Sequence, residues 1–350
     1  MFIEANLRNV TLDGLPRLSA FAEDVGFDGL GHSEVTRDPF LALTIAASNT
    51  RRVRLTTAVA IAFPRSPMIV AYLARNLQEL SRDRFVLGLG TQVRAHIQHR
   101  FSSEWGAPGP RLRDYVESLR AIWDTWQRGV PLAYQGKFYS FTLMTPEFSL
   151  GPTEYPPIRV QIGAMNPYNV QLAGEICDGV RLHSFVTPEY IRDVIWPNLR
   201  AGAARRGRSL DGFEVMAGGF IATGATQAEV DAAREKVRYR IGHYASTRSY
   251  LPVLEHHGWT DTFGQLRELI AAGRWKALAS VITDEMLDRF CAAATYERLP
   301  GVIRDRLGGL VDGVVLPMSE ELYAHRDRMA STVAELRALA PASRAPSVYG

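Results

Sequence analysis

Short apolar segments alternate with amphipathic segments along most of the chain. In residues 110–128, Leu112, Tyr115 and Leu119 recur at the spacing of one helix face. Segments of this type predict helices at 14–25, 38–48, 66–80, 110–128, 167–176, 187–205, 226–242 and 319–340. The apolar runs between them predict strands at 2–7, 27–32, 52–61, 84–90, 157–163, 178–183, 213–224 and 311–318.

Two local signals recur at the predicted boundaries. A capping side chain followed by proline opens a helix, because the first helical position needs no N–H donor; it stands at Asp38-Pro39, Ser66-Pro67 and Asn166-Pro167. The pair Asp-Gly marks the return from a helix into a strand at 28–29, 178–179 and 312–313. Repetition of one strand-then-helix unit is the pattern of a parallel sheet.

About eight such units predict an α/β protein with a (β/α)8 TIM barrel and insertions after strands four and seven. The insertions are expected at about 129–157, which contains the hairpin-like YQGKFYSF, and at about 243–308, which looks mostly helical and irregular. We therefore expect residues 1–350 to form one barrel domain. A doubly wound sheet is the alternative. Such a sheet normally carries the dinucleotide-binding motif G-x-G-x-x-G after its first strand, and no such motif follows the first predicted strand here. The later stretch GLGTQV (88–93) has Val93 in place of the third glycine of that motif.

Composition narrows the cellular setting. The chain is 46% hydrophobic and 22% charged with a formal net charge of +3, so a nucleic-acid partner has little support. Its two cysteines lie far apart in no metal-ligand spacing, which fits a reducing compartment. The start MFIEANLRNV does not resemble a signal peptide, and no apolar run reaches the roughly 18 residues of a membrane span. We expect a cytoplasmic protein without membrane attachment.

In such a barrel the active site lies at the carboxyl ends of the strands. Strand two ends at His32-Ser33-Glu34, and Glu34 is the one carboxylate in a plausible position, so hydrolysis by paired carboxylates is disfavoured. No convincing metal motif is present, and no metal is expected. Strand five runs through Gly163 into Asn166, where the helix N-terminus would bind a phosphate or serve as a plain cap.

Three stretches resemble one protein family. They are GAMNPYNVQLAGEICDGVRLHS, GFDGLGHSEVTRDPF and RLTTAVAIAFPRSPMIVAYLARNLQELSRDRFVLGLGTQ. Together they are similar to the luciferase-like monooxygenase superfamily, the bacterial-luciferase-type flavin barrels and their deazaflavin-dependent relatives. The similarity covers about residues 10–225, with 311–318 as the closing strand, and is greatest to actinobacterial coenzyme F420-dependent oxidoreductases.

The resemblance implies roles for the strand ends. His32 and Glu34 match the polar pair of strand two, near the reactive edge of the cofactor ring, and would be catalytic. The peptide bond between Ala58 and Val59 would be cis and would support the ring. The residues implied to bind the cofactor are Ala58, Val59, Gly90, Thr91, Gln92, Gly163, Ala164, Met165, Asn166, His183 and Ser184. Some members have a proton-donating glutamate where this chain has Val93.

The implied activity is F420-dependent hydride transfer between a reduced deazaflavin and a small organic substrate, an activated C=C, C=N or carbonyl. The alternative is an FMN-dependent two-component monooxygenase that uses reduced flavin and oxygen. A third possibility is a barrel that has lost its cofactor and serves as a binding or assembly protein. A flavin or F420 reductase would supply reduced cofactor, and the family usually forms homodimers. Arg94, His96 and Arg181 are candidates for the acidic F420 tail, and aromatic residues of 243–308, Tyr244 and Tyr250 among them, would cover the mouth.

Overall fold

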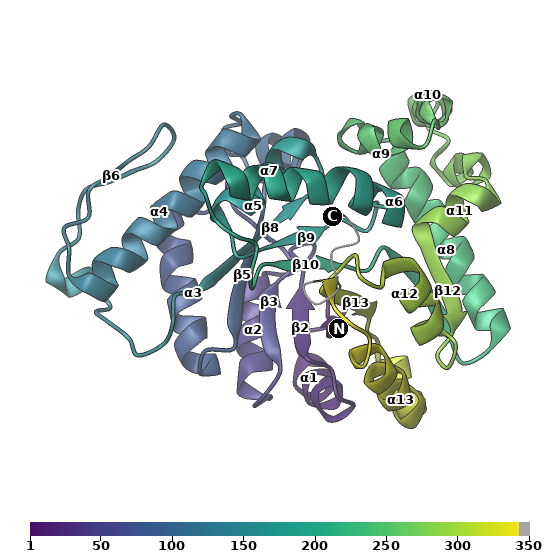
Figure 1. Ribbon diagram of the computed structural model, residues 1–350, viewed down its shortest axis with the longest axis horizontal. Helices are drawn as coiled ribbons and strands as arrows, with labels where there is room; N and C mark the ends of the chain where they lie inside the picture. Colours follow the sequence, from purple (N-terminus) through teal and green to yellow (C-terminus); the bar gives the residue numbers. More distant parts are fainter. Residues whose placement is uncertain (343–350) are drawn as a thin grey trace.

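The computed structural model describes residues 1–342, and in it the predicted (β/α)8 TIM barrel is confirmed. Parallel strands follow one another in the order β3-β2-β1-β13-β10-β9-β8-β5-β4, and pairing of β3 with β5 closes the ring. Figure 1 shows the helices arranged around the central strands. The expected domain ran to residue 350, and its last part, 343–350, lies outside the described residues.

The barrel strands are short and mostly buried. Their bounds are β1 (Phe2–Asn6), β2 (Gly29–His32), β3 (Arg54–Thr57), β4 (Ala60–Ile61), β5 (Phe85–Gly90), β8 (Arg159–Ala164), β9 (Gly179–Leu182), β10 (Glu214–Ala217) and β13 (Gly313–Pro317). The surrounding helices are α1 (Leu15–Asp24), α2 (Pro39–Ser48), α3 (Pro67–Ser81), α4 (Pro108–Arg128), α5 (Pro167–Ile176), α6 (Pro188–Tyr190), α7 (Trp196–Arg205), α8 (Gln227–Ala245), α12 (Leu299–Leu307) and α13 (Arg326–Arg337).

The three Asp-Gly pairs have a common structural role. Asp28 accepts a hydrogen bond from Ile3 N at 2.9 Å, and its counterparts Asp178 and Asp312 bind the main-chain N–H near the start of the neighbouring strand in the same way. A Cβ on the following Gly179 would lie 2.7 Å from a carbonyl oxygen of the adjacent strand. The aspartate therefore connects two strands at the amino-terminal rim, and the glycine lets them approach.

Two predicted strands are interrupted. The strand expected at 52–61 is divided into β3 and β4 by the peptide between Ala58 and Val59, which is cis as expected. The single strand expected at 213–224 is wrong: Gly219, with φ +63°, separates β10 from β11 (Phe220–Gly224). Strand β11 leaves the barrel and pairs with β12 (Cys291–Thr295), a strand that the irregular composition of 243–308 did not indicate.

Residues 129–157 extend away from the barrel beside α4 (Figure 1). They contain the hairpin of β6 (Tyr134–Gln135) and β7 (Ser140–Phe141), which confirms the hairpin expected in YQGKFYSF. The buried carboxylate of Asp114 on α4 holds this hairpin by accepting hydrogen bonds from the Tyr134 hydroxyl and from the main-chain N–H groups of Phe138 and Tyr139. One side chain thus fixes the position of the hairpin.

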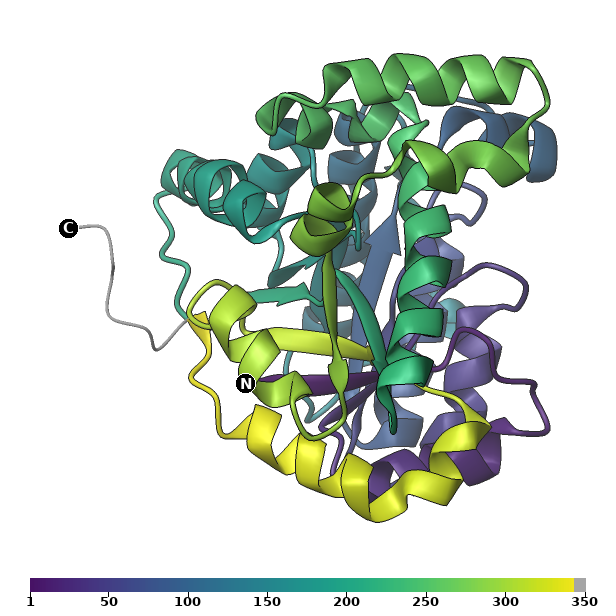
Figure 2. The same ribbon diagram turned by 90° about the vertical axis from the view of Figure 1, so that its right-hand side faces the viewer.

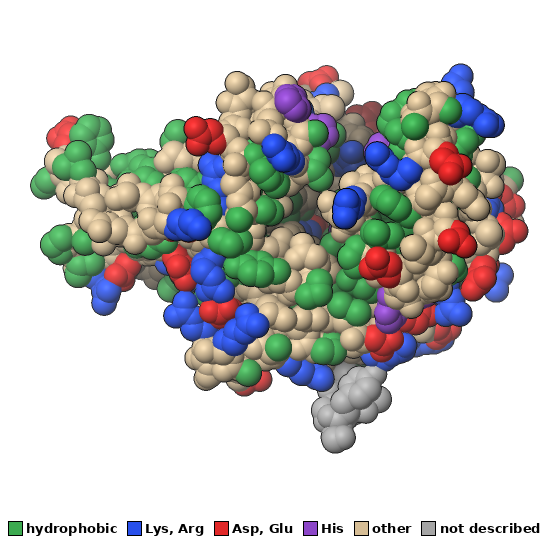
Figure 3. Space-filling view, turned by 90° about the horizontal axis from the view of Figure 1, so that it is seen from above, with side chains coloured by type: hydrophobic (Ala, Val, Ile, Leu, Met, Phe, Trp, Pro, Cys, Tyr) green, Lys and Arg blue, Asp and Glu red, His purple; other side chains and the backbone are tan. Residues whose placement is uncertain are grey.

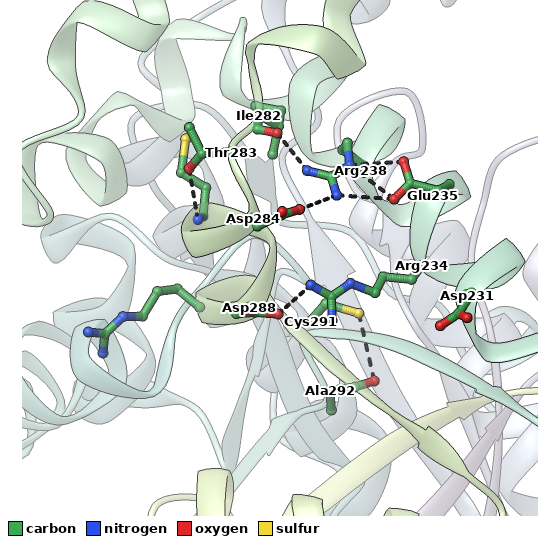
Figure 4. A network of polar contacts seen from close by, with 12 residues as sticks. Asp231, Arg234, Glu235, Arg238, Ile282, Thr283, Asp284, Asp288, Cys291 and Ala292 are labelled. Carbon is green, nitrogen blue, oxygen red and sulfur yellow. Dashed lines mark hydrogen bonds and ion pairs between the residues drawn. The ribbon is translucent and has the colours of Figure 1, made fainter. Parts of the chain in front are cut away.

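Residues 243–308 add η4 (Arg248–Tyr250), α9 (Leu251–His256), α10 (Thr260–Ala271), η5 (Trp275–Val281) and α11 (Asp284–Phe290) before β12 and α12. Figure 2 shows α8 running upright past the ends of the central strands, with these helices above it. Arginines of α8 bind α11: Arg234 pairs with Asp288 at 2.6 Å, and Arg238 with Asp284 at 2.5 Å (Figure 4). These ion pairs hold α11 against α8. Within residues 1–342, no helix combines the length and apolar character that a membrane crossing requires.

Candidate functional site

His32 ends β2 inside the barrel mouth, where it was expected. Its side chain is only 1% exposed, and neither ring nitrogen has a hydrogen-bond partner within the described part of the chain. Burial lowers the pKa of His32 to about 4, with a smaller contribution from Arg37, so the ring is neutral near pH 7. Unsatisfied buried polar atoms are costly, so the two unpaired nitrogens make His32 a candidate for contact with a ligand.

Glu34 lies close in sequence to His32 but is already engaged. Its carboxylate accepts a hydrogen bond from Ile61 N at 2.7 Å and forms an ion pair with Arg65 at 2.7 Å. Arg65 also binds Asp38, the cap of α2. The carboxylate therefore joins the strand-two end to the segment after β4. Sequence reasoning did not identify Arg65, because its contact depends on a return of the chain 31 residues later.

The strand-three end is shaped by Val59. A Cβ placed on Gly90 would come within 2.5 Å of the Val59 side chain, and a Cβ on Gly88 within 2.0 Å of the Thr57 carbonyl oxygen. The family resemblance implied that Gly90 contacts the cofactor. The space beside Gly88 is occupied by the neighbouring strand, and the space beside Gly90 by Val59, which lies at the mouth.

The segment after β5 is more exposed. Thr91 and Gln92 are half-buried; Gln92 has φ +55°, and its side-chain oxygen accepts a hydrogen bond from Val93 N at 2.9 Å. Arg94 and His96 are exposed at the start of η1 (His96–Arg100), and Arg94 donates to Gln98. These basic groups lie at the outer edge of the mouth.

Strand β8 leads into α5 through the four residues predicted to hold a phosphate. Ala164 and Met165 are buried, and the Met165 carbonyl accepts a hydrogen bond from the Tyr190 hydroxyl at 3.2 Å. Asn166 caps α5 by accepting from Asn169 N at 3.0 Å, as the Asn-Pro signature indicated. A Cβ on Gly163 would meet Val59 at 3.6 Å, so Gly163 lies across from the cis peptide.

His183 follows β9 and is enclosed by aromatic rings. Its ring centroid lies 4.6 Å from those of Tyr244 and Tyr250, and its Nδ1 accepts a hydrogen bond from Phe185 N at 3.0 Å. Burial lowers the pKa of His183 to about 4, followed by the charges of Arg240 and Arg8, so this ring is also neutral at pH 7. Its neighbour Ser184 is half-buried.

One basic residue lies elsewhere than expected. Arg181, proposed for an acidic cofactor tail, points into the barrel interior, where it pairs with Glu4 and donates to Gln161 at 3.1 Å. Below this pair, Glu214 binds Arg54 and Arg159, each at 2.9 Å. Arg181 is 7% exposed and thus neutralised inside the fold, so its assignment to the tail is wrong.

The strand ends thus form one mouth, in which the small residues Ala58, Val59, Gly90 and Gly163 lie between β2, which ends at His32, and β9, which is followed by His183. These strand ends are the place where a (β/α)8 barrel enzyme carries its active site. The chain belongs to the luciferase-like monooxygenase family, whose model matches residues 4–315. Family membership makes it an oxidoreductase and confirms the resemblance found in the sequence.

Relatives and solved structures agree with this placement. An uncharacterized protein of Mycobacterium tuberculosis is 43% identical over 316 residues, which cover 88% of this chain and 93% of that protein. A putative coenzyme F420-dependent oxidoreductase of the same organism is 32% identical over 286 residues (77% and 81% covered), and a 5,10-methylenetetrahydromethanopterin reductase of Archaeoglobus fulgidus is 30% identical over 284 (78% and 80%). The structure of the coenzyme F420-dependent tetrahydromethanopterin reductase of Methanopyrus kandleri superimposes with a TM-score of 0.75 at 20% identity, covering 96% of this chain and 98% of that one. At that identity the superposition shows the shared fold.

Proposed function

We propose that this protein is an F420-dependent oxidoreductase that transfers hydride between a reduced deazaflavin and a small organic substrate with an activated C=C, C=N or carbonyl group. The observation that carries the proposal is His32 at the strand-two end, a neutral, buried histidine whose two ring nitrogens have no partner among residues 1–342. The relatives named for coenzyme F420 support the choice of cofactor.

The small-residue side of the mouth suits a flat ring. Ala58, Val59 and Gly163 present little side-chain bulk, and the cis peptide turns the chain between β3 and β4 at this point. We propose that Ala58, Val59, Gly90, Thr91 and Gln92 contact the ring system. Gly163, Ala164, Met165 and Asn166 would hold the phosphate at the start of α5, with His183 and Ser184 beside it. When bound, the deazaflavin supplies hydride chemistry.

The protein's own residues then have separate tasks. A neutral His32 can donate a hydrogen bond from one ring nitrogen to a substrate heteroatom and accept one at the other. Its low pKa makes it a weak proton carrier at pH 7, so it orients the substrate and supplies a proton only as negative charge develops there. Glu34, also expected to be catalytic, remains a proposal; its contacts to Arg65 and Ile61 support a role in fixing the strand-two end beside His32.

The test is a titration of the purified protein with coenzyme F420 and with FMN, followed by fluorescence quenching. Preferential F420 binding, with hydride transfer that consumes no oxygen, is the expected result. Preference for FMN with oxygen uptake would instead assign the two-component monooxygenase. Binding of neither would refute the cofactor assignment of 58–59 and 163–166.

We also propose a homodimer, supplied with reduced cofactor by a separate flavin or F420 reductase. Large apolar side chains are exposed on α2, α3 and the neighbouring hairpin segment: Leu41 (51%), Ile69 (55%) and Phe148 (66%). Tyr72 on α3 donates a hydrogen bond to the Phe148 carbonyl, and Figure 3 shows the protruding segment at the left with many hydrophobic side chains. Large apolar side chains exposed on neighbouring elements favour association with a second copy.

Two further expectations remain proposals. The chain would form one domain, residues 1–350, in which about 129–157 and 243–308 are inserts. A cytoplasmic location is supported by the two cysteines, Cys177 and Cys291, which are both free and buried.

A further inference from the structure

Tyr190 on α6 holds the turn between β8 and α5. Its side chain is 2% exposed, and its hydroxyl donates a hydrogen bond to the Met165 carbonyl at 3.2 Å. The peptide between Met165 and Asn166 is planar and trans, so its N–H points opposite to that carbonyl. Across residues 1–342, the Asn166 N–H has no acceptor. Tyr190 therefore fixes the direction of a free main-chain donor in the turn proposed to hold the cofactor phosphate.

Tyr190 is in turn held by the residue that caps its helix. Its main-chain N–H donates to the hydroxyl of Thr187 at 3.1 Å, and Thr187 is fully buried. The same hydroxyl lies 2.8 Å from Nε2 of His257, which directly follows α9. This contact joins the segment after β9 to the insert at 243–308, 70 residues later in the chain, where α9 lies close to α6 (Figure 1).

Two histidines at the carboxyl end of α9 have further contacts that fix them there. The His257 ring stacks on Trp259, with centroids 4.5 Å apart and planes at 17°. The His256 ring forms a T-shaped contact with the Tyr190 ring at 5.5 Å, and its Nε2 lies 3.4 Å from an Asp193 carboxylate oxygen. Because these contacts are separate from the hydrogen bond of His257, the insert holds α6 in one arrangement.

We propose that Tyr190 is a positioning residue for the cofactor phosphate, and that the insert acts on this site through His257 and Thr187. This rests on the proposed function in one respect: residues 163–166 receive the phosphate. It makes the insert, expected from the sequence only to cover the mouth, a part of phosphate binding. Three hydrogen bonds of 2.8, 3.1 and 3.2 Å connect the end of α9 to the Met165 carbonyl.

The test compares ligands with and without a phosphate. Dissociation constants of coenzyme F420 and of its phosphate-free deazaflavin core are measured by fluorescence quenching for the wild type and for single variants. Tyr190→Phe removes only the hydroxyl and should weaken F420 binding roughly three- to tenfold, the range for one lost hydrogen bond, while the affinity for the core stays unchanged. Tyr239→Phe, which removes an exposed hydroxyl on α8, is the matched control and should change neither affinity.

Variants of His257 test the contribution of the insert. His257→Phe keeps a ring against Trp259 but lacks the nitrogen that contacts Thr187, so it should also weaken F420 binding and spare the core. His257→Gln can replace the Nε2 contact and should restore part of the affinity. The double variant Tyr190→Phe/His257→Phe should bind F420 no more weakly than Tyr190→Phe alone, because both substitutions act through one hydroxyl.

Two results would overturn the proposal. Equal losses for F420 and the core in Tyr190→Phe would assign a general structural role to the residue. Unchanged F420 affinity in Tyr190→Phe would show that the turn needs no such support. If the protein prefers flavin, FMN and riboflavin replace this pair of ligands, because they differ only in the phosphate, and the same outcomes apply.

Amide exchange of the cofactor-free protein separates this inference from the proposed function. The main-chain N–H groups of Asn169 and Val170 both bind Asn166, each at 3.0 Å, and report whether the turn is held. They should exchange faster in Tyr190→Phe and His257→Phe than in the control variant. Faster exchange in a protein that binds neither F420 nor FMN would refute the proposed function and leave the coupling between insert and turn standing. Unchanged exchange would overturn the coupling.

Discussion

Replacing His32 tests whether the mouth holds a buried neutral histidine. The ring has a pKa of about 4 in the folded chain and 6.5 as the ordinary value. Between these values the unfolded chain binds a proton that the folded chain does not, so this residue makes the protein less stable as the pH falls from about 6.5 toward 4. With this pKa difference for His32, the free energy of unfolding should fall by about 2 kcal/mol between about pH 7.5 and pH 5.

The assay is urea unfolding of wild type and His32→Gln at both pH values. The wild type should lose about 2 kcal/mol more than the variant on acidification, because glutamine does not titrate. His96→Gln removes an exposed histidine from the same face and controls for the loss of a histidine as such. An identical pH dependence in wild type and His32→Gln would show that His32 is solvated in the folded protein. The structural basis for its role at the mouth would then be lost.

Three further predictions follow from single contacts. Gly90→Ala should lower stability by about 1–3 kcal/mol and weaken cofactor binding, because the new Cβ would lie 2.5 Å from Val59. Gly163→Ala, whose Cβ would lie 3.6 Å from Val59, is the control. Equal melting temperatures of the two variants would contradict the packing argument. Asp114→Ala should release the 134–141 hairpin, seen as faster amide exchange there, at a cost of about 1–3 kcal/mol; unchanged exchange would show that other contacts hold it. Ile69→Asp should shift a homodimer toward monomer in light scattering, whereas a dimer of unchanged mass would place the interface elsewhere.

The barrel itself could be predicted from local signals. Alternating apolar runs and amphipathic helices, proline after a capping residue, and repeated Asp-Gly pairs are all short-range patterns, and each is present in the structure at the expected place. The strand-end rule then located His32 and the cap at Asn166, because parallel strands deliver their carboxyl ends to one face, whereas the cis peptide was implied by the family resemblance. The error at 213–224 has a local cause: two adjacent glycines can continue a strand or turn it, and only Gly219 in its left-handed conformation ends β10.

The electrostatic state of each side chain was decided by tertiary structure. From their positions in the sequence, Arg181 and Glu34 were both expected to be free at the mouth. In the structure, Arg181 is paired with Glu4 in the interior, and Glu34 is paired with Arg65. Likewise, Gly88 within β5 lets the neighbouring strand approach closely, a role that its place in an apolar run does not reveal. Residue type and spacing determined which groups reach the strand ends. Which of them stay free depends on partners 31 to 177 residues away, and only the closed barrel brings those partners within hydrogen-bonding distance.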